Sequence, residues 1–151
     1  MPITYMPGSG HSRFCVYHLV NPANELPFYI GYTTDPSDRM KSHLKGNVAT
    51  AEGCARHAVI TTLAFAKLPI TMEIHRTFPY RGQAMRHESA TIKGMLSGDV
   101  PILNSSARSL ESRLATHLAA IMNRVVNPVL PYSMGVNGVE PDFRYTIASS
   151  S

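Results

Sequence analysis

The chain has 151 residues, of which 44% are hydrophobic and 16% carry a charge. This hydrophobic share is typical of a folded domain and excludes an intrinsically disordered chain. The net charge of +4 and the pI of about 9.3 permit an anionic partner without identifying one. The longest apolar stretch, residues 58–70, contains Thr61, Thr62 and Lys67, so no membrane helix is predicted. The first residues lack the pattern of a secretion signal, and we therefore expect a cytoplasmic protein.

Two strands and a helix are predicted near the start of the chain. Residues 14–20, FCVYHLV, and residues 27–33, PFYIGYT, are rich in β-branched and aromatic side chains, which favours strands. The turn-forming residues between them indicate an antiparallel hairpin. Asp35 and Pro36 predict a helix over residues 36–45, because Asp caps free amides and Pro suits the first helical position.

The remainder of the chain predicts three more helices, over residues 55–67, 82–96 and 107–126, and a strand over residues 70–78. This order predicts an α+β fold in which a small three-stranded, mostly antiparallel sheet is flanked by helices. We expect a flexible lead-in over residues 1–12, a domain over residues 13–106, and a C-terminal helix with an extended tail over residues 107–151. That last segment would pack on the domain or form a dimer interface.

Glu88 is the most informative single position. It shares a predicted helix face with the apolar residues Met85, Ile92 and Met95. A carboxylate that faces a core is costly unless it is paired or bound to a metal. A structural ion pair at the rim of the core is the simpler alternative, and spacing alone does not exclude it.

Two further pairs of residues suggest a site. Arg39 and His43 lie one helical turn apart, and together they can bind a phosphate and move a proton. A solvated helix face is the alternative interpretation. Tyr17 and Tyr29 lie on neighbouring predicted strands, where cross-strand packing alone would explain them.

In combination, these residues resemble the GIY-YIG nuclease family. The resemblance runs from about residue 14 to residue 104, and its most specific part is YIGYTTDPSDRMKSHLKG, residues 29–46. The first motif departs from the family pattern, because Cys15 stands where the family has a glycine. His43 is similar to restriction-enzyme-like and small stand-alone members, whereas the incision subunit of excision repair carries a tyrosine there. The matching positions are Val16, Tyr17, Tyr29, Ile30, Gly31, Arg39, His43, Glu88, Leu103 and Asn104.

The resemblance implies a division of labour in phosphodiester hydrolysis. Glu88 would hold a single divalent metal ion, Mg²⁺ or Mn²⁺, whose remaining positions are filled by water. Tyr17 would help to activate the attacking water, with Arg39 supplying the charge that such a phenol needs. Tyr29 would position the water or the phosphate, and His43 would assist proton transfer.

Other residues would support this centre or contact nucleic acid. Gly31 would keep the backbone close to the substrate, and Asn104 would brace a loop near the site. Basic side chains would contact the phosphate backbone and give a salt-dependent affinity without base readout. The expected nucleic-acid contacts are Tyr32, Thr33, Lys41, Lys45, Arg81 and Arg86, with Arg56 as a further candidate.

These expectations describe a metal-dependent endonuclease that hydrolyses double-stranded DNA to 5′-phosphate and 3′-hydroxyl ends. Its role would be restriction-type or associated with a phage or mobile element, and it would act as a monomer or a homodimer. Two alternatives stay open. One is a catalytically inactive nucleic-acid-binding module of the same fold, and the other is an RNA-directed or structure-specific nuclease.

Overall fold

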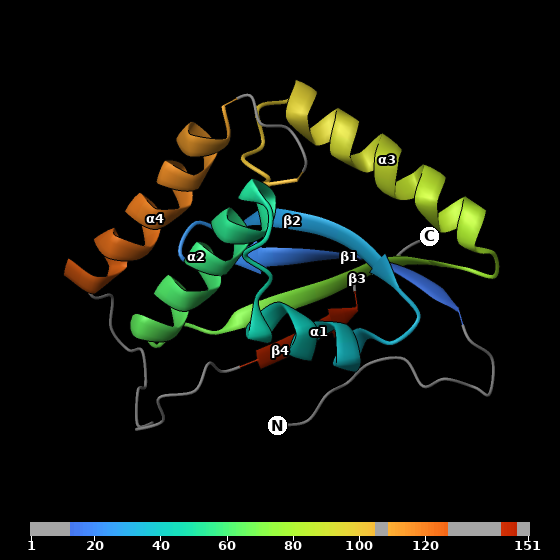
Figure 1. The fold of residues 1–151 in the computed structure, drawn as a ribbon, viewed down its shortest axis with the longest axis horizontal. Helices are drawn as coiled ribbons and strands as arrows, with labels where there is room; N and C mark the ends of the chain where they lie inside the picture. Colours follow the sequence, from blue (N-terminus) through green and yellow to red (C-terminus); the bar gives the residue numbers. More distant parts are fainter. Residues whose placement is uncertain (1–12, 105–108, 127–142, 148–151) are drawn as a thin grey trace.

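A computed structural model describes residues 13–104, 109–126 and 143–147 (Figure 1). The expected lead-in over residues 1–12 and most of the expected tail lie outside these residues. The elements follow the order β1 (Phe14–Asn21), β2 (Leu26–Thr33), α1 (Pro36–Lys45), α2 (Ala51–Phe65), β3 (Ile70–Phe78), α3 (Arg81–Ser97), α4 (Leu110–Val126) and β4 (Phe143–Ile147).

The sheet has the strand order β2-β1-β3-β4. β1 is antiparallel to both β2 and β3, which confirms the predicted α+β fold and its three-stranded antiparallel sheet. β4 adds a parallel partner to β3 and was not predicted, because the sequence analysis expected only an extended tail there. Within β1 and β2, Tyr17 lies directly opposite Gly31, and Leu19 lies opposite Tyr29.

The helices cover both faces of the sheet. One core joins Tyr17, Leu19 and Met72 of the sheet to Met40 of α1 and Val59 of α2, and it also receives α4. A second, smaller core on the opposite face joins Val16 and Ile30 to Ala84 of α3. Alternate residues of one strand therefore contribute to different cores, as the period of two in a strand requires.

The starts of α1 and α2 illustrate one confirmed and one wrong boundary. α1 begins at Pro36 as predicted, and the Asp35 carboxylate accepts a hydrogen bond from the amide of Asp38 at 3.0 Å. α2 begins at residue 51, four residues before the predicted start. There the Thr50 hydroxyl accepts from the amide of Gly53 at 2.9 Å. A side chain at Gly53 would collide with the carbonyl oxygen of Asn47, so glycine is required in this first turn.

His117 of α4 fastens the segment after α3 to the sheet. Its Nε2 lies 2.8 Å from the carbonyl oxygen of Pro101, and its Nδ1 lies 3.0 Å from the side-chain nitrogen Nδ2 of Asn21. Because a carbonyl only accepts, Nε2 carries the proton and Nδ1 accepts from Asn21. Burial lowers the pKa of His117, which favours this neutral ring. The contact helps to fix the segment that leads to Asn104.

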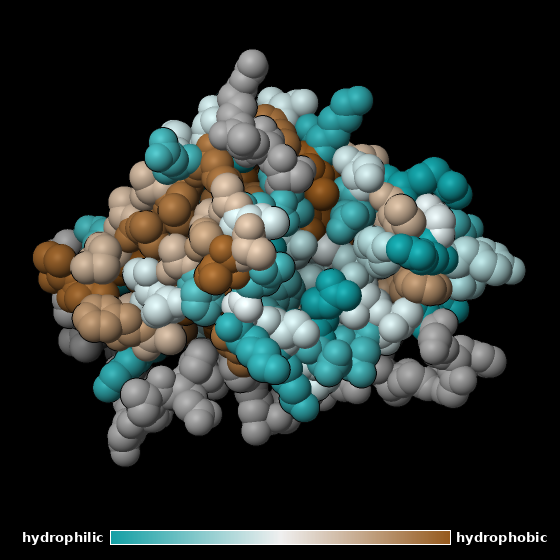
Figure 2. All heavy atoms as spheres, in the orientation of Figure 1, coloured by the Kyte–Doolittle hydropathy of each residue, from teal (hydrophilic) through white to brown (hydrophobic). Residues whose placement is uncertain are grey.

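On the face seen in Figure 2, apolar residues gather toward one side. Figure 2 shows hydrophobic residues gathered over the side of α2 and α4, and hydrophilic residues toward the side of α3. Four exposed apolar side chains lie toward the C-terminal ends of these two helices, namely Phe65, Met122, Val125 and Val126. Within the part of the chain that the structure describes, none of the helices combines the length and the apolar character needed to cross a bilayer.

Candidate active site

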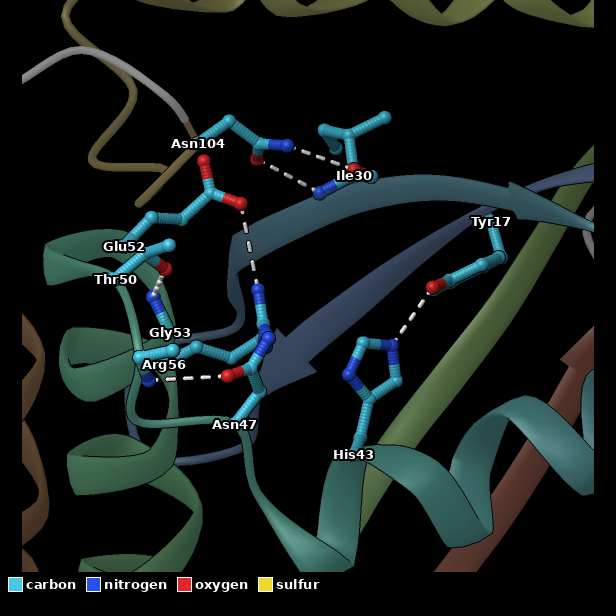
Figure 3. Close-up of polar contacts among 10 residues, drawn as sticks. Tyr17, Ile30, His43, Asn47, Thr50, Glu52, Gly53, Arg56 and Asn104 are labelled. Atoms are coloured by element: carbon cyan, nitrogen blue, oxygen red, sulfur yellow. Dashed lines mark hydrogen bonds and ion pairs between the residues drawn. The ribbon is translucent and has the colours of Figure 1, made fainter.

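Tyr17 and His43 form the buried centre of the site (Figure 3). The Tyr17 hydroxyl lies 2.7 Å from Nε2 of His43, and the two rings meet edge to face. Tyr17 is fully buried on β1, and His43 on α1 is only 6% exposed. The structure thus joins a strand residue and a helix residue that are 26 positions apart in one hydrogen bond.

The protonation states of this pair follow from their surroundings. Burial raises the pKa of Tyr17 far above its ordinary value, and the charges of Arg39 and Arg56 only partly oppose this. Burial and the charges of Arg56 and Arg39 lower the pKa of His43 to about 3. Near neutral pH, the phenol is therefore protonated and the imidazole is neutral. Tyr17 is fully buried, and its hydroxyl is hydrogen-bonded to His43.

Gly31 provides the space that Tyr17 occupies. An alanine Cβ at position 31 would lie 2.5 Å from the Tyr17 hydroxyl oxygen and 2.7 Å from its ring carbon Cζ. The Tyr17 phenol fills the space beside this glycine, so packing alone accounts for the absence of a side chain there.

We expect Gly31→Ala to lower the free energy of unfolding by about 1–3 kcal/mol, the usual cost of overpacking a core. Gly94→Ala is the matched control, because a Cβ at that position of α3 meets no atom within 4 Å. We expect the control to stabilise the protein by about 0.5–1 kcal/mol through helix propensity. Urea unfolding of both variants checks this, and a Gly31→Ala variant as stable as the wild type would contradict the packing.

Tyr29 is enclosed by aromatic and cationic neighbours. Its ring lies 6.4 Å from the Tyr17 ring and 5.3 Å from the His43 ring, measured between centroids. The Arg56 guanidinium of α2 lies 4.6 Å above the Tyr29 ring, and Glu52 pairs with Arg56 at 3.4 Å (Figure 3). Burial raises the pKa of Tyr29, and the charge of Arg56 opposes this rise.

The charges of Arg39 and Glu88 act on one another and on Tyr29. Glu88 is half-buried on the inward face of α3, and this face is defined by the fully buried Ala84 together with Ile92. Met85, which the sequence analysis used to define that face, is 43% exposed. Burial and the negative charge of Glu52 raise the pKa of Glu88, whereas the charge of Arg39 lowers it. The charge of Arg39 also acts on Tyr17, so Arg39 influences both Tyr17 and Glu88.

The residues present fit a single hard divalent cation. In residues 13–104, 109–126 and 143–147, no group of three or more His, Cys, Asp and Glu side chains is arranged to hold a metal. A lone carboxylate with water in the other positions is a common way for proteins to bind Mg²⁺. Burial first, and then the negative charge of Glu52, raise the pKa of Glu88, and a bound cation would favour its ionised form.

Asn104 braces the strand that carries Tyr29. Its side-chain oxygen accepts from the amide of Ile30 at 2.9 Å, and its side-chain nitrogen donates to the carbonyl of Ile30 at 2.7 Å (Figure 3). The amide of Leu103 donates to the carbonyl of Phe28 at 2.8 Å. These bonds satisfy backbone groups of Phe28 and Ile30 on the outer edge of β2, beside the site.

The expected nucleic-acid contacts fall into two groups. Lys41, Lys45, Arg81 and Arg86 are exposed, and the Arg81 side chain also donates to the Tyr32 hydroxyl at 3.1 Å. Thr33, in contrast, is only 7% exposed, and its hydroxyl bonds to the backbone of Asp35 at the start of α1. Thr33 is therefore better explained by the turn into the helix than by a contact with nucleic acid.

Glu52 was missed by the sequence analysis, and Arg56 was assigned a different position. Arg56 was expected on the DNA-facing surface, yet its side chain is 11% exposed and lies over Tyr29. The missed signal is the Glu–Arg spacing of four, which pairs the two side chains on one helix face. It was hidden because the predicted helix began at residue 55, after Glu52.

Neutral buried histidines predict a pH-dependent stability. Burial is the main cause that lowers the pKa of both His18 and His43 to about 3, whereas an unfolded histidine titrates near 6.5. Between these values the unfolded chain binds more protons, so the free energy of unfolding falls as the pH is lowered. Each histidine contributes up to about 1.4 kcal/mol per pH unit.

Urea unfolding at pH 7.5, 6.5, 5.8 and 5.0 measures this dependence. We expect a clear loss of stability that begins near pH 6.5, before most carboxylates protonate. A stability that is constant from pH 7.5 to pH 5.0 would show that the two rings are not held neutral.

The family model of the GIY-YIG catalytic domain matches residues 13–97, which is more than half of the chain. The chain belongs to the GIY-YIG nuclease family. No curated protein and no solved structure gives a significant match. The matched region contains Tyr17, Tyr29, Arg39, His43 and Glu88, and membership makes this a nuclease domain whose substrate is nucleic acid.

Proposed function

We propose that this GIY-YIG domain is a divalent-metal-dependent DNA endonuclease, and that Tyr17, Tyr29, Arg39, His43 and Glu88 form its active site. The observation that carries the proposal is the convergence of these residues from β1, β2, α1 and α3. The charge of Arg39 acts on the buried phenol–imidazole pair, and the charge of the half-buried Glu88 acts on Tyr29. This set combines proton transfer, phosphate binding and metal binding, which phosphodiester hydrolysis requires.

His43 is the proposed proton acceptor, held in place by the Tyr17 hydroxyl. The imidazole is neutral, but the charges of Arg56 and Arg39 make it a weak base. An incoming phosphate would offset these charges, so we expect substrate binding to raise the pKa of His43 toward a useful value. Water would lose a proton to His43, its oxygen would bond to phosphorus, and the bond from phosphorus to the 3′ oxygen would break. The leaving 3′ oxygen would take up a proton from solvent and become the 3′-hydroxyl.

Arg39 and Tyr29 would orient the phosphate. The guanidinium offers several donors to the phosphate oxygens, and the hydroxyl of the half-buried Tyr29 is a further donor. Glu88 would hold Mg²⁺ or Mn²⁺, which supplies charge stabilisation at the phosphate and at the leaving oxygen. A half-buried position gives Glu88 access both to solvent and to the site.

Product analysis tests the reaction and its substrate class. We expect the protein to cut duplex DNA, and a DNA ligase to rejoin the ends directly, because they carry 5′-phosphate and 3′-hydroxyl groups. An RNA duplex of the same sequence is the comparison substrate. Ends that need prior treatment with a phosphatase or a kinase, or preferential cutting of RNA, would contradict the proposal.

We also propose a restriction-type or phage-associated role with a homodimeric enzyme. A dimer would let two copies of one small domain cut both strands. The exposed apolar residues Phe65, Met122, Val125 and Val126 support association on the α2–α4 side. Light scattering of the wild type and of Phe65→Ser tests this. A wild type that is monomeric at all concentrations would contradict it.

A further inference from the structure

Arg56 and Glu52 bring a charge pair into the site from a helix that the family resemblance did not implicate. They are one turn apart on α2, and their side chains are 11% and 28% exposed. An exposed ion pair of this spacing contributes little to stability. The burial of this pair therefore needs an explanation other than a gain in helix stability.

The position of Arg56 supplies that explanation. Its guanidinium lies 4.6 Å from the centroid of the Tyr29 ring, which is the range of a cation–π contact. His43 contacts the same ring at 5.3 Å with an interplanar angle of 70°. The Tyr29 ring is therefore contacted both by the guanidinium of α2 and by the imidazole of α1.

Glu52 fixes the direction of Arg56. Its carboxylate lies 3.4 Å from the Arg56 guanidinium (Figure 3), and that guanidinium lies over the Tyr29 ring. The charge of Glu52 also acts on Tyr29 and on Glu88, so the pair reaches both the phenol and the proposed metal ligand.

We propose that Arg56, held by Glu52, is a positioning residue that fixes Tyr29 against His43 for catalysis. This inference rests on the proposed nuclease function. It predicts that a cation at position 56 matters more than the ion pair as such, because only the cation contacts the ring.

A charge-swapped variant separates the two roles. Glu52→Arg/Arg56→Glu restores an ion pair on α2 but places a carboxylate beside the Tyr29 ring. We expect its single-turnover cleavage rate to fall at least tenfold, while the DNA affinity stays within threefold of the wild type. Arg56→Gln should behave in the same way, and Arg56→Lys should recover part of the rate because it keeps a cation there. Lys93→Gln is the control, since it removes one positive charge from an exposed position of α3.

A second measurement tests the contact without activity. In ¹⁵N-arginine spectra, the ring current of Tyr29 should displace the side-chain resonances of Arg56, and Tyr29→Leu should remove the displacement. Circular dichroism and urea unfolding identify any variant that fails to fold.

The outcomes separate this inference from the proposed function. An active wild type together with a folded charge-swapped variant that cuts within twofold of its rate overturns the positioning role alone. Absence of the ring-current shift overturns it as well. A wild type that cuts no nucleic acid overturns the proposed function and this inference together.

Discussion

Replacing Glu88 with Gln should abolish cleavage, with a loss of at least about 10³-fold in the single-turnover rate. The neutral amide keeps the shape of the side chain but removes the charge that would bind the metal. Glu88 is half-buried and its pKa is raised by burial and by Glu52, so removing its charge costs little stability. We expect the variant to fold and to bind DNA as well as the wild type does.

The comparison needs a matched carboxylate. Glu111→Gln is suitable, because Glu111 is exposed in the first turn of α4. It should cut at the wild-type rate. A Glu88→Gln variant that cuts within threefold of the wild type would remove Glu88 from the role of metal ligand.

Replacing Arg39 with Ala should lower the single-turnover rate by about 10²–10⁴-fold, the usual loss on removing a donor that stabilises transition-state charge. The structure supports a large effect, because the charge of Arg39 acts on Tyr17, Tyr29, His43 and Glu88 together. The fold should be retained, since Arg39 is partly exposed and not part of either core.

Arg39→Lys separates charge from geometry. Lysine restores the positive charge but not the planar set of donors, so we expect only partial recovery of the rate. Lys93→Ala controls for the loss of one positive charge at an exposed position. An Arg39→Ala rate close to that of the wild type would contradict a role for Arg39 in phosphate binding.

Much of the fold follows from local signals in the sequence. Residues within or beside the hairpin, α1 and β3 predict each of these elements. Examples are the turn after β1 and the Asp–Pro pair before α1. β4 has no comparable signal, because a parallel strand is defined by a partner far away in the chain. The predicted start of α2 at residue 55 was wrong, because Thr50 caps an earlier first turn that contains Gly53.

In the candidate site, too, local sequence signals do not predict contacts between residues that lie far apart in the chain. The motif identified Tyr17, Tyr29, Arg39, His43 and Glu88, but their contacts depend on the tertiary fold. Tyr17 is fully buried beside Gly31 and hydrogen-bonded to His43, and no local signal in the sequence predicts this pairing.

The contribution of α2 could not be predicted. Arg56 belongs to no motif, and only the packing of α2 against the sheet places it over Tyr29. Its burial separates it from the exposed basic residues with which it was grouped.

The most direct test of the central claim is cleavage of supercoiled plasmid by the wild-type protein with Mg²⁺, with Mn²⁺ and with EDTA. The account predicts nicked and linear products with either metal and none with EDTA. Discrete fragments would also support sequence-specific cutting. Intact plasmid under all conditions, with the protein folded, or cutting that is equal in EDTA, would contradict a metal-dependent DNA endonuclease.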